Sequence, residues 1–347
     1  MKTPISTLLP ICCSCALVAS PAAFADDTSF EKRLPDGVIS PDKQFLTFTI
    51  ENDAFGNGTD QGYTSGVRAT WFDLGAEPPG FVRLLDRYLP GFEIDETTAV
   101  YYSFGQNLYT PEEIDTPVPN PDDRPYAAFL YASAGFSNLR GNHIDDIELT
   151  IGVVGPWALG EQTQSAVHEI VDATDPQGWD QQLDNEPGLI FSWQRRWPEA
   201  VAFDAGALHL RVMPHAGFSL GNVYTYGAGG LTLQLTPTTR RWQSQPLRVQ
   251  PAIPGTGFFD VVDNETAWAL FLGVEGRAVA RNIFLDGNTF SDSPSVEKEP
   301  LVADVNAGIS VTRGRLQVAY TLNWRSSEFE GQRDESLFGA ISFGYRF

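Results

Sequence analysis

The sequence lacks long hydrophobic runs, has few basic residues and confines its cysteines to one short stretch. No run reaches the roughly 18 uninterrupted apolar residues that a membrane-spanning helix needs, so a helical membrane bundle is excluded. Lys and Arg number 23 against 44 Asp and Glu, for a formal net charge of −21. Nucleic-acid binding requires clustered Lys and Arg, so we expect no nucleic-acid partner.

The cysteines belong to a segment with the features of a secretory signal peptide. A positively charged start precedes the mostly apolar run Ile5–Ala19, and Ala23-Phe24-Ala25 fits the small-x-small cleavage rule. All three cysteines (Cys12, Cys13 and Cys15) lie in that run, so a disulfide framework or a metal site is not expected from them. A lipoprotein anchor at Cys13 or Cys15 is the alternative, but the residues before each Cys do not match its usual small-apolar pattern.

The last residues of the chain indicate where the exported protein goes. Large apolar side chains fall at positions 341, 343, 345 and 347, and small or polar groups fall at 340, 342, 344 and 346. Because successive strand side chains point to opposite faces, this segment has one apolar and one polar face. A strand of this kind that ends on an aromatic residue, Phe347, is typical of the closing strand of a bacterial outer-membrane barrel.

Alternating segments recur along the rest of the chain and predict an all-β fold. With 32 glycines and 12 % aromatics, they suit an antiparallel transmembrane β-barrel of about twelve strands. The candidate strands are Phe45–Asp53, Tyr63–Phe72, Ala99–Leu108, Ala127–Phe136, Asp145–Val154, Leu189–Trp197, Ala202–Phe218, Asn222–Leu235, Ala267–Arg281, Leu301–Arg313, Arg315–Arg325 and Glu335–Phe347. A soluble β-sandwich also has alternating strands, but the export segment and Phe347 favour the membrane.

These features divide the chain into three parts: a signal peptide at 1–25, a periplasmic lead-in at 26–44 and the outer-membrane barrel at 45–347. Tight joins at Gly221-Asn222 and Arg313-Gly314-Arg315 are expected to be periplasmic turns. Longer joins rich in Pro, Asp and Asn are expected to be outside loops: Thr110–Pro125, Thr236–Glu265 and Asp286–Pro300.

One segment, Gly160–Asp172, breaks the β pattern and predicts a short helix near the rim. Its apolar residues Ala166, Val167, Ile170 and Val171 recur at helical spacing. Gln164 and His168 are four residues apart, so they share one face of that helix. We expect the helix to lie across the rim or against the wall from inside rather than to face lipid.

Several blocks of sequence, in order, resemble the outer-membrane lipid A deacylases that remove the 3′-linked acyl chain. The first block is Glu51-Asn52-Asp53-Ala54-Phe55 with Tyr63-Thr64-Ser65-Gly66. The others are Gln106–Pro111, Asp123–Ala128, Gly155–Glu161 with Gln164 and His168, and Gly178–Pro187. They span roughly residues 45 to 230, and their ordered combination is more specific than any one block.

The resemblance implies a twelve-stranded barrel with its active site at the outer-leaflet side, between wall and helix. It also implies calcium-dependent hydrolysis of an ester that releases a 3′-acyloxyacyl group from lipid A. Onto this chain it carries Asn and Asp at the end of the first strand (Asn52, Asp53), Thr64 in the second strand, and Gln164 and His168 on the helix. At least some members use a lysine in the loop after the Tyr-Thr-Pro block. Here residues 112–116 hold no Lys or Arg, so either Arg124 substitutes from the same loop or oxyanion stabilisation rests more heavily on the metal.

The chemistry of these residue types agrees with ester hydrolysis, which needs an activated water and a cation or donor at the carbonyl oxygen. A neutral histidine suits proton removal from water, and calcium prefers oxygen ligands. We therefore expect His168 to be the general base and Gln164 to orient it. Asp53 and Asn52 are expected to bind Ca²⁺, and Thr64 to position water or substrate.

Two alternative functions belong to other classes of outer-membrane protein. A serine-dependent outer-membrane lipase would commonly show His-x-Ser, but the four histidines are followed two residues on by Asp145, Ile170, Arg211 and Gly217. A passive porin or structural barrel would need neither calcium nor the Gln164–His168 pair. The expected partners are lipid A within lipopolysaccharide and the lipids of the outer membrane, and the sequence leaves the oligomeric state open.

Overall fold

The computed structural model describes residues 44–56, 62–73, 76, 80, 98–237, 249 and 262–347. The expected signal peptide, most of the lead-in and the residues 57–61 lie outside this part of the chain. The described part is dominated by strands: β1 (Gln44–Asn52), β2 (Gly62–Asp73), β3 (Ala99–Thr110), β4 (Ala127–Arg140), β5 (His143–Val154), β6 (Glu186–Arg196), β7 (Val201–Ala205), β8 (Leu208–Gly221), β9 (Tyr224–Pro237), β10 (Val262–Asn282), β11 (Leu301–Gly314), β12 (Leu316–Arg325) and β13 (Ser336–Arg346).

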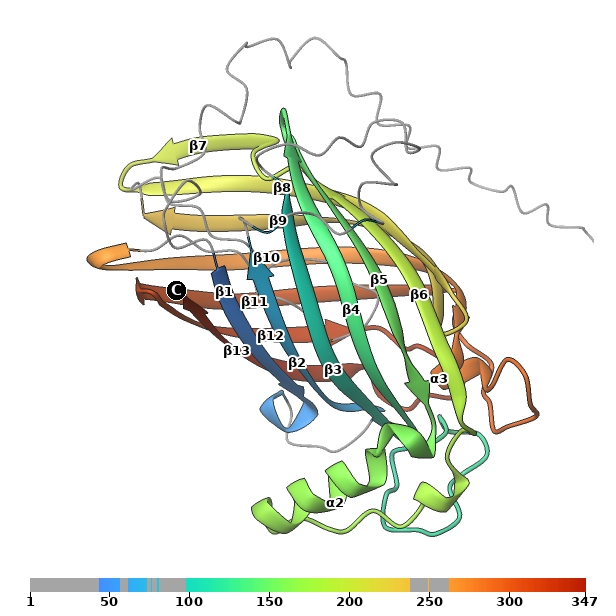
Figure 1. Cartoon of the computed structure of the whole chain (residues 1–347). Helices are drawn as coiled ribbons and strands as arrows, with labels where there is room; N and C mark the ends of the chain where they lie inside the picture. The colour runs from blue at the N-terminus through green and yellow to red at the C-terminus, as the bar shows by residue number, and fades with distance from the viewer. Residues whose placement is uncertain are drawn as a thin grey trace, which may run out of the picture.

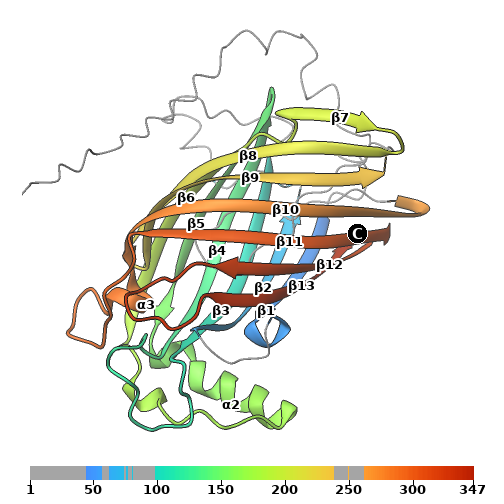
Figure 2. The same cartoon turned by 180° about the vertical axis from the view of Figure 1, so that it is seen from behind.

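Twelve of these strands form a closed antiparallel barrel, as predicted (Figures 1 and 2). Consecutive strands pair around the sheet, β6 pairs directly with β8, and β1 pairs with β13 to close it. Closure leaves no unpaired edge in the ring, which is the condition for strands to cross a hydrocarbon layer. Within the described residues, no helix has the length and apolarity needed to cross a membrane.

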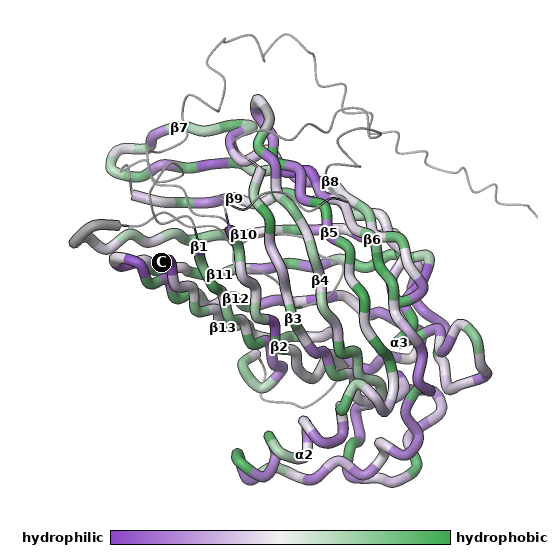
Figure 3. The backbone as a smooth tube through the Cα atoms, viewed as in Figure 1, coloured by the Kyte–Doolittle hydropathy of each residue, from purple (hydrophilic) through white to green (hydrophobic). Residues whose placement is uncertain are grey.

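The two faces of the wall have opposite chemistry. Phe343 pairs with Phe48, and both are exposed on the outside, whereas the neighbouring pair Ser342 and Thr49 is buried and joined by a hydroxyl hydrogen bond of 2.9 Å. The same alternation runs along the other strands (Figure 3). An exposed apolar outer face around a polar interior is the pattern of a membrane barrel and the reverse of a water-soluble one.

The thirteenth strand corrects one predicted element. The expected strand Ala202–Phe218 is two strands, β7 and β8, which pair with each other. Between them Gly206 has φ +65°, a conformation that favours glycine, and the chain reverses there. β7 therefore extends the sheet beside β8 and does not contribute to the closed ring.

The ends of the barrel also differ from the expectation. The turn at Gly221-Asn222 lies at the same end of the barrel as the helix α2 (Gly160–Val171). Asn222 contacts the start of β6, which follows the connection that contains α2: its Oδ1 accepts from Leu189 N–H, and its side-chain amide donates to Glu186. The turn at Gly314 follows β11 at the other end. The join between β9 and β10 also leaves from that other end, opposite the joins Thr110–Pro125 and Asp286–Pro300. An antiparallel ring alternates its ends strictly, so loop length alone was a poor guide to sidedness.

The interior is filled at the end where α2 lies. Inward residues of β3, β4 and β9 pack with α3 (Ile283–Asp286) in one apolar cluster that includes Tyr109, Phe129, Tyr131, Tyr224 and Phe284. The rings of Tyr109 and Phe284 are stacked with centroids 4.0 Å apart. Deeper inside, Arg68 of β2 pairs with Glu148 of β5 at 2.6 Å, and both side chains are buried.

Candidate active site

The connection between β5 and β6 forms a small lobe on the outside of the barrel. This outer lobe contains η5 (Pro156–Ala158), α2 and η6 (Trp179–Gln181). It packs against outward-facing residues of β3 and β4 in a second apolar cluster of Leu108, Tyr126, Ala128, Ala158 and Trp179. From the same outward face, Gln106 donates through Nε2 to the carbonyl oxygen of Ala158 at 2.6 Å.

α2 lies near the rim of the barrel, as predicted, but its lobe packs on the outer side of the wall and not inside it. The interior at this end is occupied by the aromatic cluster, whereas the outward apolar residues of β3 and β4 need a cover. Close contact depends on Gly160, because a Cβ there would lie 2.5 Å from the Cβ of Ala128 and from the Trp179 ring. In Figures 1 and 2, α2 then runs from the ends of β4 and β5 toward the side on which β1 ends.

The predicted pair Gln164 and His168 is buried on the face of α2 that packs toward the wall, with exposures of 2 % and 6 %. The amide oxygen of Gln164 accepts from Trp179 Nε1 at 2.8 Å. Its Nε2 is buried and makes no hydrogen bond within the described residues. His168 Nδ1 makes a close contact with the carbonyl oxygen of Thr174.

This contact bears on the expected role of Gln164. If Nδ1 donates to Thr174, the lone pair of the neutral ring lies on Nε2, which is the form a general base requires. In that case a backbone carbonyl fixes the tautomer of His168. Gln164 is oriented by Trp179, and its predicted role as the orienter of His168 stays a prediction.

The first hairpin places Asn52 and Asp53 at the rim of the barrel. Asn52 ends β1 in the outward-facing register of Phe48 and Ile50, and Asp53 opens η4 (Asp53–Phe55). Both side-chain Oδ1 atoms accept from the N–H of Ala54, each at 2.8 Å, so two oxygens converge on one nitrogen. Thr64 lies in β2 at a register irregularity between Tyr63 and Ser65; the structure does not describe its side chain.

Asp53 also lines a cavity of about 370 Å³ at the mouth of the barrel. The mouth cavity lies between the β3–β4 and β12–β13 loops, and its other lining residues include Glu112, Asp123, Arg124 and Phe338. Gln164 and His168 are not among its lining residues. The structure thus places the predicted residues in two groups, one on α2 and one at the rim, and no single described cavity joins them.

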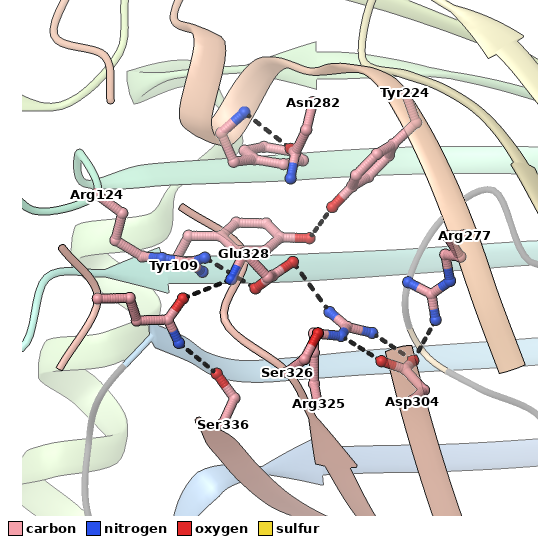
Figure 4. A network of polar contacts seen from close by, with 12 residues as sticks. Tyr109, Arg124, Tyr224, Arg277, Asn282, Asp304, Arg325, Ser326, Glu328 and Ser336 are labelled. Atoms are coloured by element: carbon pink, nitrogen blue, oxygen red, sulfur yellow. Dashed lines mark hydrogen bonds and ion pairs between the residues drawn. The ribbon is translucent and has the colours of Figure 1, made fainter. Parts of the chain in front are cut away.

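A chain of alternating charges lies behind this cavity (Figure 4). Arg124 pairs with Glu328 at 2.9 Å, Glu328 with Arg325 at 3.3 Å, and Arg325 with Asp304 at 2.8 Å. Asp304 also pairs with Arg277. Burial alone would raise the pKa of Glu328, but the charges of Arg325 and Arg124 outweigh it and hold this pKa below its ordinary value.

Arg124 is the candidate substitute for the lysine that residues 112–116 lack. Its guanidinium is buried, faces Glu328, and lies 5.8 Å and 5.7 Å from the ring centroids of Tyr109 and Phe329. This environment holds the side chain in the wall of the mouth cavity. Its substitution for the lysine stays a prediction.

Three features of the site have no recognisable signal in the sequence. Trp179 holds Gln164 from 15 residues away, and no local pattern marks this pairing. The carbonyl of Thr174 has no side-chain signature at all. The pairing of Arg124 with Glu328 spans 204 residues of sequence, so only the closed ring reveals it.

At the rim, the side chains of Asn52 and Asp53 offer oxygen donors to a metal ion. Within the described part of the chain, no group of three or more His, Cys, Asp or Glu side chains has metal-site geometry. The amide and carboxylate oxygens of Asn52 and Asp53 are donors that calcium accepts, and backbone carbonyls could add to them. The donor chemistry fits calcium, although side chains alone do not form a complete ligand set.

The apolar exterior, the polar interior and the closed ring define an outer-membrane β-barrel, here with a helical lobe on its outer wall. A family model described as outer membrane protein LpxR matches residues 11–347, nearly the whole chain. The chain belongs to this LpxR family of outer membrane proteins.

Comparison with solved structures agrees on the fold. LpxR from Salmonella typhimurium matches with a TM-score of 0.70 at 20 % sequence identity, and the match covers 87 % of this chain and 100 % of that one. The β domain of the Bordetella autotransporter BrkA matches with a TM-score of 0.42 at 10 % identity, and that match covers 88 % of this chain and 98 % of that one. A comparison with curated protein sequences finds no match.

Proposed function

We propose that this protein is a lipid A deacylase of the outer membrane, a carboxylic ester hydrolase that removes the 3′-linked acyloxyacyl group from lipid A in lipopolysaccharide. Membership of the LpxR family and the ordered sequence blocks that resemble lipid A 3′-O-deacylases support the reaction class. The substrate would reach the site from the outer leaflet, beside the end of the barrel that carries the outer lobe.

The observation that carries this proposal is the burial of Gln164 and His168 against the outer wall. Burying polar groups among apolar residues costs free energy unless hydrogen bonds compensate it. Here an indole N–H and a backbone carbonyl orient the two side chains. Positioned polar groups beside a lipid-facing wall suit the hydrolysis of a lipid ester.

In the reaction, His168 would remove a proton from water through Nε2 while the water oxygen attacks the acyl carbonyl carbon. The ester C–O bond then breaks, the fatty acid leaves as a carboxylic acid, and the sugar 3′-oxygen takes the proton from the imidazolium. Gln164, fixed at its oxygen by Trp179, would donate from Nε2 to the attacking water or to the carbonyl oxygen. Thr64 would help to position either group.

Asn52 and Asp53 would hold calcium at the rim, since their side-chain oxygens converge near Ala54 N–H. Bound there, calcium would polarise the acyl carbonyl and stabilise its developing negative charge. This role would compensate for the absence of a basic residue at positions 112–116.

The packed interior of the barrel favours the enzyme over the alternative of a passive porin. The aromatic cluster around Phe284 fills the barrel at the lobe end, and Val249, itself buried, accepts from the Tyr131 hydroxyl at 2.8 Å. The backbone N–H of Val249 also donates to the Glu51 carboxylate at 3.1 Å. A conducting pore needs open, hydrated space at these positions.

Mass spectrometry of lipid A tests the proposal. Membranes containing the purified protein are incubated with lipopolysaccharide in calcium, and in parallel with a chelator. We expect loss of the 3′-acyloxyacyl mass in calcium and intact lipid A with the chelator. Intact lipid A in both, together with single-channel currents in planar bilayers, would instead identify a porin.

A further inference from the structure

The outer lobe exposes several large apolar side chains. Trp157 and Leu159 of the η5 turn are 71 % and 51 % exposed, and Val167 and Ile170 of α2 are 47 % and 83 % exposed. Val171 at the end of α2 is exposed as well. We call these five residues the apolar flank of α2.

The other flank of the helix is acidic. At 100° per residue, Val167 and Ile170 lie to one side of the line of Gln164 and His168 that faces the barrel. On the opposite side lie Glu161, Ser165, Glu169 and Asp172, which are exposed or half-buried. A helix with one apolar and one charged flank is suited to a boundary between hydrocarbon and water.

The outer lobe that carries this flank adjoins the lipid-facing wall. Phe104 lies two residues along β3 from Gln106, the outward residue that the lobe covers, and Phe104 itself is exposed. Ile151 is exposed in the same way two residues along β5 from Val153, which packs on the lobe's apolar cluster. The exposed apolar wall therefore continues up to the edge of the lobe.

We propose that the apolar flank of α2 inserts into the acyl-chain layer of the membrane leaflet at this end of the barrel. The occupant of this surface is membrane lipid, because the lobe that exposes the flank borders an apolar wall that membrane lipid covers. The acidic flank then faces the head groups and water. This anchoring goes beyond the proposed function and does not depend on it.

Site-directed spin labelling tests the proposal without any measurement of activity. The full chain, with Cys12, Cys13 and Cys15 replaced by Ser, carries one nitroxide at Ile170→Cys and is reconstituted in bilayers of phosphatidylethanolamine and phosphatidylglycerol. Glu169→Cys is the matched control on the acidic flank, and Leu189→Cys on the outer wall is the lipid-facing reference. Collision rates with oxygen, which concentrates in lipid, and with a nickel chelate, which stays in water, are compared.

We expect the oxygen-to-nickel ratio at 170 to match that at 189 and to exceed that at 169 several-fold. Equal, nickel-accessible labels at 169 and 170 would overturn the proposal, because both flanks would then face water. Low collision rates with both reagents at 170 would also overturn it and would identify a protein cover; spin–spin broadening would identify that cover as a second copy of the chain.

Discussion

The mouth cavity and the wall-facing side of α2 lie at the same end of the barrel but use polar groups differently. Behind the mouth cavity, Arg124, Arg325 and Arg277 alternate with Glu328 and Asp304, so buried charges are paired with one another. On α2, the side chains of Gln164 and His168 are held by an indole and a carbonyl. Paired charges connect loops and strands, whereas hydrogen-bonded Gln and His side chains are suited to proton transfer. We therefore propose a structural role for the charge chain behind the cavity, and a chemical role for the α2 pair together with Asp53 at the edge of the cavity.

The largest effect on activity is expected from His168→Ala, which removes the proposed base. Loss of a general base typically costs about 10²- to 10⁴-fold in rate. We therefore expect release of the 3′-acyl group, followed by mass spectrometry of lipid A, to fall by that amount while the protein still assembles in the membrane.

The matched control is His143→Ala, because His143 lies in the turn region at the other end of the barrel. It should leave acyl release unchanged. Equal losses of acyl release in the two variants, or full activity of the His168 variant, would contradict a catalytic role for the polar side of α2.

Gly160→Ala is expected to lower activity by roughly tenfold, by displacing α2 from the wall. The added methyl group would lie 2.5 Å from the Cβ of Ala128, and at that distance one of the two elements must move. Gly227→Ala is the control, since a Cβ there would meet nothing within 4 Å. A fully active Gly160 variant would show that the contact of α2 with the wall is not needed.

Trp179→Phe is expected to have a smaller effect because it removes only the indole N–H that fixes Gln164. Leaving a buried acceptor without its donor costs about 1–3 kcal/mol, part of which should appear as a lower kcat. Thermal unfolding of the variant provides the control, since a purely structural role would lower stability and leave the turnover of the folded protein unchanged.

Glu328→Gln should affect activity least and stability most. Because the pKa of Glu328 is lowered in the folded protein, its ionised form stabilises the fold above the ordinary carboxyl pKa of about 4.3, and this stabilisation is lost as the pH falls through the lowered value. The variant should unfold at lower denaturant concentration than the wild type at pH 7, and the difference should shrink toward low pH. A difference that is constant with pH would contradict the pairing with Arg325 and Arg124.

The barrel could be predicted from sequence because alternate residues of a strand point to opposite faces, so a two-residue period of apolar side chains identifies the residues that share one face. The helix could be predicted in the same way, and α2 spans Gly160–Val171 as the spacing of Ala166, Val167 and Ile170 indicated. Periodicity does not say what a face will meet, so the packing of α2 on the outer wall was missed. The reversal at Gly206 was also missed, because one glycine within an alternating run is a weak sign of a turn.

The site was predictable only in part for a related reason. Gln164 and His168 are adjacent on one helix, so their spacing relates them. Glu328 is 204 residues from Arg124, and only the folded ring brings the two together. Trp179 and the carbonyl of Thr174 lie in the same lobe as their partners, but the fold of the lobe, which sets these contacts, has no periodic pattern in the sequence.

The central claim is that the polar face of α2 and the end of the first strand act as one active site, and a double-mutant cycle tests it most directly. The values of kcat/KM for acyl release are measured for Gln164→Ala, Asn52→Ala and the double variant, at saturating calcium. Residues that act on one reacting ester should be non-additive, so we predict that the double variant loses clearly less than the product of the two single losses. Losses that multiply, or an Asn52 variant with wild-type activity, would contradict a shared site.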